Sequence, residues 1–354
     1  MLFHETSVYG LLKYGGSQNM EIYNCSATGK SLDEWYATGR SQPILGFTLL
    51  TYGSLIELLY VPSLYVISGP SYIKMPCYKI MCLLGILDMF AIVTNSLLTG
   101  YLLIKGAVFC TNPDLIFYFG AAGVGFWCAA CMCCLLLVIN RLFEIWKPHM
   151  AERIFKGWKF IIILTLPILY GAYFFFYTPP VLFTSIHDSW FFDPFIFENR
   201  TAEYMNPPHT INNLLLCAIT CLLYTALCGV LAHQFGQGGA ENKMSWGQRS
   251  IFIQSTAICI ANLVAALIYV FMQFFPTPAF CILLGHFCWE LCHGFPALVY
   301  VTINRSVRRD IFRLIGLGHL AKGGSRNTVD YKSDNKKSTN QAHSNEAFSA
   351  DHAI

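Results

Sequence analysis

Charged side chains are scarce in this sequence of 354 residues. Only 12% of the residues are Asp, Glu, Lys or Arg, and 55% are hydrophobic, whereas a typical soluble domain carries about 25% charged residues. The mean hydropathy is +0.48. This composition excludes a disordered chain, a coiled coil and a basic nucleic-acid-binding protein, and it disfavours a soluble enzyme. It indicates a protein whose main solvent is lipid.

Catalytic and cofactor motifs are also missing. The sequence has no G-x-S-x-G, no H-E-x-x-H and no glycine-rich phosphate loop beside a lysine, so we expect neither an enzyme nor a cofactor. Cysteine is frequent, at 15 residues, but most cysteines lie inside long apolar runs. We interpret Cys131, Cys133 and Cys134 as small side chains that pack helix against helix rather than as a metal site.

Seven apolar runs are long enough to cross a bilayer, because about 20 apolar residues span a hydrocarbon core of roughly 30 Å. Backbone hydrogen bonds must be satisfied internally in lipid, and the runs lack the alternation of barrel strands, so all seven are predicted to be helices. The predicted spans are Pro43–Ile67, Tyr78–Ile104, Pro113–Asn140, Trp158–Tyr177, Ile211–Phe235, Ile251–Phe275 and Phe280–Ile303. The predicted fold class is therefore all-α, a seven-transmembrane helix bundle.

The distribution of Lys and Arg predicts the orientation. With the N-terminus outside, the inner loops hold nine basic residues, the C-terminal tail nine and the outer segments five, which is the bias expected for cytoplasmic loops. Two N-x-[ST] sequons, at Asn24 and Asn199, then lie outside and are predicted glycosylation sites. The first 42 residues contain no apolar run typical of a signal peptide, so we expect the first span to act as the insertion signal.

The composition divides the chain into four parts. We expect an extracellular segment over 1–42, the bundle over 43–303, an amphipathic juxtamembrane helix over 304–317 and a disordered cytoplasmic tail over 318–354. Ser306–Leu317 places apolar residues at helical spacing with three arginines on the opposite face, which is typical of a helix lying on the inner leaflet.

Cysteines in the predicted outer segments are few. They are Cys25, Cys110 and Cys281, and disulfides persist in that compartment. The long outer loop over Thr178–Thr210 has no cysteine, so Cys110 pairs with another residue or stays free, and Cys25 is the candidate. In the same loop Trp190-Phe191-Phe192 lies among acidic residues, and this pattern fits either a lid over a pocket or aromatic side chains at the membrane interface.

Three acidic residues fall inside predicted spans: Glu57, Asp88 and Glu290. Because His286, Glu290 and His293 are spaced i, i+4 and i+7, they share one face of the seventh helix. Charged groups in a bilayer usually face the bundle interior. This polar face is suited to bind a ligand, to relay a conformational change or to bond the other acids, and it also fits the alternative of a transporter or ion-conducting protein.

Several short motifs are distributed along the chain between about residues 20 and 315. They are Tyr23-Asn24-Cys25-Ser26, Pro43-Ile44-Leu45-Gly46, Cys77-Tyr78-Lys79-Ile80-Met81, Leu84-Gly85-Ile86-Leu87-Asp88, Gly106-Ala107-Val108-Phe109-Cys110, Asn140-Arg141, Trp190-Phe191-Phe192-Asp193-Pro194-Phe195, Pro208-His209-Thr210-Ile211-Asn212-Asn213 and Asn304-Arg305. Together they resemble the nematode serpentine receptor class T, a family of seven-helix G-protein-coupled chemoreceptors.

The resemblance implies switch roles for a few residues. Where the general receptor pattern ends span three with an acid–Arg–Tyr motif, Asn140-Arg141 keeps only the arginine, whose implied role is a cytoplasmic switch at the G-protein site. Asp88 keeps the span-two pattern, and Pro296 and Tyr300 correspond to the displaced Asn-Pro-x-x-Tyr motif of span seven. Span six departs from the pattern, because Ile251–Phe275 contains no proline.

We therefore expect a G-protein-coupled chemosensory receptor for an external small molecule of the odorant or pheromone class. Its expected place is the plasma membrane and, by the family resemblance, the cilia of sensory neurons. Its expected partners are a heterotrimeric G protein, the ligand and membrane lipid, but not nucleic acid. The expected ligand contacts are Phe117, Phe119, Trp127, His209, Asn213, His286 and Glu290.

Overall fold

The structure is a computed structural model that describes residues 3–236, 246–275 and 278–317. The predicted tail over 318–354 and the middle of the third inner loop, 237–245, lie outside the described residues.

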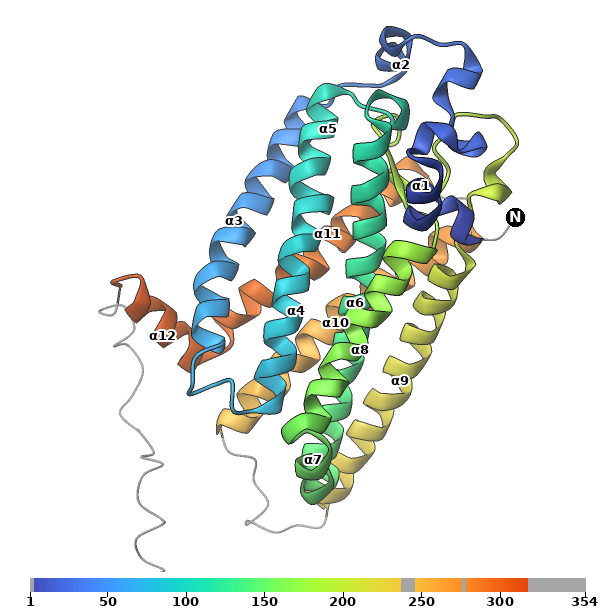
Figure 1. Cartoon of the computed structure of the whole chain (residues 1–354). Helices are drawn as coiled ribbons and strands as arrows, with labels where there is room; N and C mark the ends of the chain where they lie inside the picture. The colour runs from blue at the N-terminus through green and yellow to red at the C-terminus, as the bar shows by residue number, and fades with distance from the viewer. Residues whose placement is uncertain (1–2, 237–245, 276–277, 318–354) are drawn as a thin grey trace, which may run out of the picture.

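Seven helices in the described part of the chain are long and apolar enough to cross a membrane, which confirms the predicted bundle. Figure 1 shows them side by side. They are α3 (Pro43–Ile67), α4 (Pro76–Ile92) continued through a π-helical turn, η5 (Val93–Leu98), into α5 (Thr99–Lys105), α6 (Pro113–Trp146), α8 (Gly157–Tyr177), α9 (Pro207–Gly236), α10 (Trp246–Phe274) and α11 (Ala279–Thr302).

Several helices begin or end a few residues away from the predicted spans. Pro43, Pro76 and Pro113 are the first helical residues of their helices, since proline lacks only an N–H that the first turn leaves unpaired. The third helix continues six residues beyond the predicted end at Asn140, to Trp146. Hydropathy marks where the chain leaves lipid, whereas a helix continues into water as long as its backbone is paired.

The third span, α6, lies at the centre of the bundle. In α6, 72% of the most apolar stretch is buried, against 22% in α8 and 17% in α9. Glycine allows close contact between α6 and α8, because a Cβ on Gly125 would lie 2.9 Å from the carbonyl oxygen of Gly171, and a Cβ on Gly171 would lie 2.7 Å from that of Gly125. Small residues at such crossings let helix backbones approach in lipid.

The N-terminal segment is folded against one end of the bundle. It contains α1 (Val8–Tyr14) and α2 (Leu32–Thr38) joined by short 3-10 turns, and Figure 1 shows both above the bundle. Ser17 donates a 2.6 Å hydrogen bond to Asp114, and Tyr204 donates one of 2.6 Å to the carbonyl of Ile22. We name this end the outer end, after the predicted orientation, and the opposite end the inner end.

A β-hairpin closes the outer end. Its strands are β1 (Leu182–Thr184) and β2 (Ser189–Phe191), which pair antiparallel with Phe183 opposite Trp190. A single bridge between Val108 and Thr184 joins the hairpin to the loop before α6. Because β1 also contacts α6 and β2 contacts α11, the hairpin lies over the outer part of the bundle.

Two short helices lie at the inner end, α7 (Pro148–Ile154) and α12 (Arg305–Leu314). The predicted amphipathic helix is present as α12, although it ends at Leu314 rather than Leu317. Val307 and Ile311 are buried, and Tyr72 donates a 2.6 Å hydrogen bond to Asp310. Burial first, and this hydrogen bond second, raise the pKa of Tyr72 well above its usual value.

Candidate functional site

A cavity of about 160 Å³ lies in the outer half of the bundle, beneath the hairpin. Its wall is formed by α6, α9, α10, α11 and the hairpin, and most of its side chains are aromatic. The residues that line it are Gly123, Val124, Trp127, Val181, Ser189, Trp190, Phe191, Phe192, His209, Tyr269, Met272 and Trp289. An apolar cavity with a few polar groups is the usual form of a small-molecule site.

The hairpin forms the roof of this cavity. Trp190 donates a 2.8 Å hydrogen bond from its indole nitrogen to Thr99 Oγ1 on α5, and its ring packs against Phe183 with centroids 5.5 Å apart. Phe192 meets His209 edge to face at 5.3 Å. Of the two interpretations of these aromatic residues, the geometry favours the lid for Trp190, because this residue lines the cavity and is buried.

Trp127 has a fixed orientation in the wall. Its indole nitrogen donates a 2.8 Å hydrogen bond to Asn213 Oδ1, and Asn212 donates to the same oxygen at 3.1 Å. Asn213 is fully buried behind the indole. The position of this ring is therefore set by a buried polar pair, which is costly to break in an apolar interior.

His209 is the main polar group of the cavity wall. It is 8% exposed, and its Nδ1 has no hydrogen-bond partner among the described residues. Buried polar atoms are nearly always paired in folded proteins. This imidazole nitrogen is therefore suited to bond a polar group of a bound ligand.

Of the seven predicted ligand contacts, two line the cavity. Trp127 and His209 line the cavity, and Asn213 lies one layer behind them. His286 and Glu290 are buried on α11 next to Trp289, whose ring meets that of His286 at 5.9 Å, but neither lines the cavity.

Phe117 and Phe119 also lie outside this cavity. Phe117 faces the N-terminal segment and meets the ring of Tyr23 edge to face at 5.2 Å, and Phe119 is half-buried at the edge of the outer core cluster. On α6 the cavity is lined instead by Gly123, Val124 and Trp127. A helix turns about 100° per residue, so a neighbour in sequence lies on another face.

The sequence interpretation missed Tyr269, Met272 and Trp289. Trp289 directly precedes Glu290, and the sequence prediction for this segment rests on its polar residues His286, Glu290 and His293. The structure shows that Gly123 faces this indole, because a Cβ there would lie 3.2 Å from the ring, but the sequence alone does not reveal this pairing. Tyr269 and Met272, on the sixth span, are one helical turn apart, but nothing in their spacing shows which helix face is inward.

Beneath the cavity is a buried polar network. His293 Nδ1 lies 2.7 Å from Asp88 Oδ1, and Tyr60 donates a 3.0 Å hydrogen bond to Asp88 Oδ2. Ser96, on the π-helical turn, bonds to the carboxylate of Glu290, and its hydroxyl also donates a 2.7 Å hydrogen bond to the carbonyl of Leu49 on α3. The network therefore joins the first, second and seventh spans.

Trp127 connects the cavity to this network. Its ring meets the imidazole of His293 edge to face, with centroids 6.0 Å apart, and His293 is bonded to Asp88. Asn95 also donates from the π-helical turn to the carbonyl of Trp289, at 3.5 Å. Two cavity residues are thus linked to the second span: Trp127 through His293 and Asp88, and Trp289 through its own carbonyl and Asn95.

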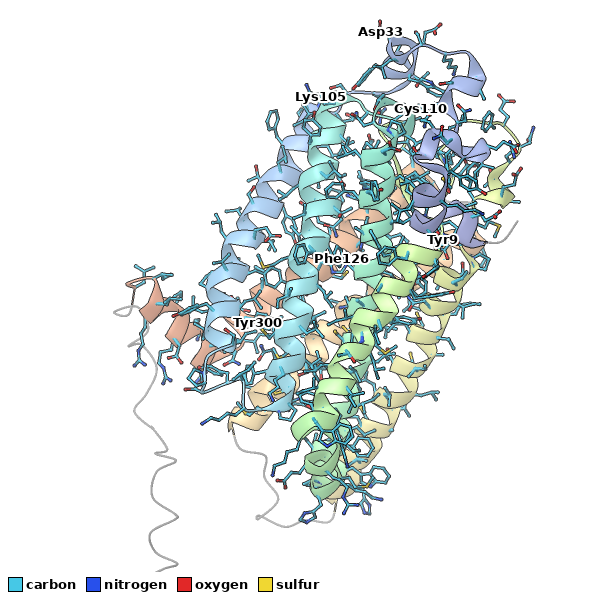
Figure 2. The ribbon with its side chains drawn as sticks, in the orientation of Figure 1. Tyr9, Asp33, Lys105, Cys110, Phe126 and Tyr300 are labelled. Atoms are coloured by element: carbon cyan, nitrogen blue, oxygen red, sulfur yellow. A yellow bond between two sulfur atoms is a disulfide. The ribbon has the colours of Figure 1, made fainter. Side chains whose placement is uncertain are left out.

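The predicted switch residues lie nearer the inner end. Arg141 is 7% exposed; it pairs with Glu144 and donates a 3.4 Å hydrogen bond to Ser255 on α10. The buried amide of Asn140 has no hydrogen-bond partner among the described residues. Tyr300, labelled in Figure 2, is fully buried and donates to the carbonyl of Met81 at 3.2 Å, and Pro296 is buried in the same helix.

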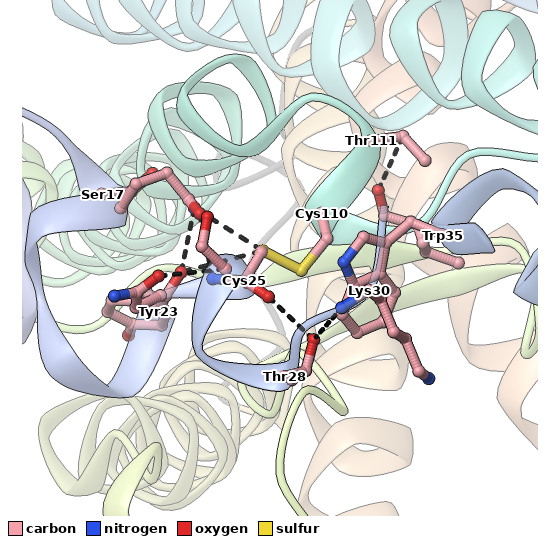
Figure 3. The surroundings of a disulfide bond; sticks show 12 residues. Ser17, Tyr23, Cys25, Thr28, Lys30, Trp35, Cys110 and Thr111 are labelled. Atoms are coloured by element: carbon pink, nitrogen blue, oxygen red, sulfur yellow. Dashed lines mark hydrogen bonds between the residues drawn. A yellow bond between two sulfur atoms is a disulfide. The ribbon is translucent and has the colours of Figure 1, made fainter. Parts of the chain in front are cut away.

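A disulfide joins Cys25 to Cys110, with the two Cα atoms 5.7 Å apart. It holds the N-terminal segment to the loop that enters α6, and Figure 3 shows it among Ser17, Tyr23 and Trp35. The amide of Cys25 donates to Gln18 Oε1 at 2.9 Å. The pairing considered from the sequence is thus the one present in the structure.

The two predicted glycosylation sites lie in different surroundings. Asn199 is exposed and has a left-handed backbone, with φ of 62°. Asn24 is half-buried, and its side-chain oxygen accepts a 3.0 Å hydrogen bond from the amide of Ser26. Asn199 is therefore the more accessible of the two predicted sites.

Comparison with known proteins agrees with this architecture. A relative in Caenorhabditis elegans, serpentine receptor class T-55, is 26% identical over 305 residues, which are 84% of this chain and 82% of the relative. The crystal structure of squid rhodopsin superimposes with a TM-score of 0.57 at 12% identity, over 90% of this chain and 95% of that one, which shows a shared fold. Residues 10–323 match the family described as serpentine type 7TM GPCR chemoreceptor Srt. The chain belongs to this Srt family of serpentine chemoreceptors.

Proposed function

We propose that this chemoreceptor binds an external small molecule in the cavity beneath the hairpin and signals through a heterotrimeric G protein. The observation that carries the proposal is the position of Trp127, which lines the cavity and also contacts His293 of the buried polar network. A ligand that moves this indole would also act on the hydrogen bond between His293 and Asp88, which joins the seventh span to the second.

The cavity indicates a class of ligand. Its wall is mainly aromatic, and it offers His209 and Ser189 as polar groups. A volume of about 160 Å³ suits a compact molecule of odorant size that is mostly apolar and carries one hydrogen-bonding group. Burial of its apolar surface supplies the binding free energy, and the polar group orients it.

Signalling requires unequal affinity of the ligand for two arrangements of the bundle. Arg141 on the third span donates a 3.4 Å hydrogen bond to Ser255 on the sixth, and we assign this contact to a closed inner end. The signalling arrangement would separate α10 from Arg141 and open the inner end to the G protein. The proposed location is the plasma membrane, in the cilia of sensory neurons.

The test is expression of the receptor in cells with a calcium or cyclic-nucleotide readout, against a panel of odorants and pheromones. We expect an active compound whose response weakens when Trp127 or His209 is replaced, whereas replacement of the lipid-facing Leu222, which is 69% exposed, leaves it unchanged. Substrate-dependent uptake or current in vesicles that contain the receptor but no G protein would overturn the proposal, because it would assign Glu57, Asp88 and Glu290 to a transport path instead.

A further inference from the structure

A second cavity, of about 420 Å³, lies at the inner end between α10, the end of α11 and α12. Its wall carries three arginines from two helices and two hydroxyl side chains. The lining residues are Arg249, Ser250, Ile253, Thr302, Ile303, Arg305 and Arg308. Among these described lining residues none is acidic, so the cavity is strongly cationic.

Asn304 fixes the arrangement of the arginines. It donates hydrogen bonds to Tyr78 Oη on α4, at 2.7 Å, and to Gln254 Oε1 on α10, at 3.1 Å, and it accepts one from the amide of Val307 at 3.1 Å. The first turn of α12 is thereby held beside α10. Arg305 and Arg308 then face the same space as Arg249.

Arg308 is oriented further by a 2.7 Å hydrogen bond from Nη1 to the carbonyl of Thr302. A guanidinium has five N–H donors, so most of its donors remain for a ligand. The acidic residue of the same helix is directed elsewhere, because Asp310 binds Tyr72, Arg309 and Arg313. The helix thus presents two arginines to the cavity and two to its own carboxylate.

We propose that this cavity binds the phosphorylated headgroup of an anionic lipid of the predicted cytoplasmic leaflet. Guanidinium groups match phosphate oxygens in geometry and charge, and basic pockets between helices on this side of a membrane are suited to such headgroups. Ile253, 43% exposed on α10, lines the same cavity, and Leu314 and Ile315 are about half exposed near the end of α12. These apolar side chains place the cavity at the membrane surface, where a lipid carries its phosphate.

A bound headgroup would bridge α10 to α12 through Arg249 on one side and Arg305 and Arg308 on the other. It would resist separation of these helices and stabilise the closed inner end. Binding itself does not depend on the signalling proposed above, so a failure of either proposal is distinguishable from a failure of the other.

The experiment uses the full-length receptor in detergent micelles, titrated with phosphatidylinositol 4,5-bisphosphate and, separately, with phosphatidylcholine, with bound lipid counted by native mass spectrometry. Arg305→Gln with Arg308→Gln is compared with Arg309→Gln and Arg313→Gln, which removes the same charge from the same helix. We expect the cavity pair to weaken binding of the bisphosphate by at least about tenfold and the control pair to change it by less than about threefold.

Three results of these titrations would overturn the proposed site: equal loss in both pairs, equal binding of phosphatidylcholine, or no binding to the wild-type receptor. Equal loss would mean that charge at the membrane surface attracts the lipid without a defined site. A further titration with soluble inositol 1,4,5-trisphosphate identifies the source of the phosphate. Weaker binding of this free headgroup supports a lipid, whereas equally tight binding would overturn the lipid assignment. Arg249→Gln repeats the comparison from α10, so the conclusion does not depend on the folding of α12.

Discussion

The indole nitrogen of Trp127 and the side-chain oxygen of Asn213 are 2.8 Å apart, and this hydrogen bond sets the ring that lies between the outer cavity and the polar network below it. The Trp127 ring lines the proposed ligand site. The same ring also contacts His293, which is hydrogen-bonded to Asp88 on another helix.

Trp127→Phe removes the indole donor and leaves an aromatic ring. We expect it to reduce the potency of an activating ligand about tenfold and to cost about 1 kcal/mol of stability, because Asn213 loses a partner in the interior. The measurement is a double-mutant cycle with Asn213→Ala, using dose–response curves and thermal unfolding. Strict additivity of the two effects would contradict the coupling of these residues.

Asp88→Ala removes the buried acceptor of His293 Nδ1 and one of the two acceptors of the Tyr60 hydroxyl, which keeps the carbonyl of His293. We expect a loss of about 3 kcal/mol, since removing one partner of a buried pair is strongly destabilising. Asp88→Asn keeps an acceptor oxygen and serves as the matched variant, with a smaller loss. Thermal unfolding in detergent distinguishes the two, and equal midpoints for both variants would show that the hydrogen bonds do not carry the stability.

Arg141→Ala removes the contact with Ser255 and the pair with Glu144. We expect ligand binding to stay within about twofold while G-protein activation falls at least about tenfold, since the residue lies far along α6 from the cavity and its proposed role is at the inner end. Arg153→Ala, at an exposed position on α7, is the control. Intact activation in the Arg141 variant would refute the switch role.

Cys25→Ser and Cys110→Ser should have the same effect, because each removes the one disulfide between these positions. The bond closes a loop over a sequence separation of 85, and loss of a native disulfide typically costs about 2–5 kcal/mol. Reductant should lower the unfolding temperature of the wild type and leave both variants unchanged. A reductant effect of equal size in the variants would point to other cysteines.

Asp188, in the hairpin loop, should make the outer end slightly more stable as pH falls. Burial raises the pKa of this carboxyl, and Arg40, 3.0 Å away, offsets the shift only in part. An acid whose pKa is higher in the folded state than its unfolded value of about 3.9 takes up protons on folding. Its contribution to stability therefore declines as pH rises through the window above pH 3.9 and up to the raised pKa.

The measurement is the unfolding midpoint between pH 4 and 7. Asp188→Asn should remove this part of the pH dependence, amounting to less than about 1 kcal/mol because the ion pair is partly exposed. Asp33→Asn, at an exposed position on α2, is the comparison. An unchanged pH profile in the Asp188 variant would refute the assignment.

The fold could be predicted closely because lipid imposes strict rules on sequence. Runs such as Pro113–Asn140 must be helical when no water is present to pair the backbone. Seven such runs leave few folds other than a seven-helix bundle. The amphipathic helix after the seventh span was predictable for a similar reason, since Val307 and Ile311 share one face and arginines the other. The ordered N-terminal segment was not, because α1 and α2 are short, and helices of that length are stable only through tertiary contacts.

The site was predictable only in part. Trp127 and His209 line the cavity, but Phe117 faces Tyr23, and Trp289 lines the cavity without being among the predicted contacts. In a lipid-embedded bundle both the core face and the lipid face of a helix are apolar, so hydropathy does not reveal which residues point inward.

The composition of the sequence determined seven helices, the distribution of Lys and Arg predicted an orientation, and short motifs carried the resemblance to one family of receptors. Only the tertiary structure decided that Trp127 lies between the cavity and His293, and that Arg249, Arg305 and Arg308 surround one space. The physical reason is that crossing a bilayer depends on the local composition of each segment. A binding site depends instead on how helices distant in sequence rotate and pack against one another, and close contacts between them set that rotation.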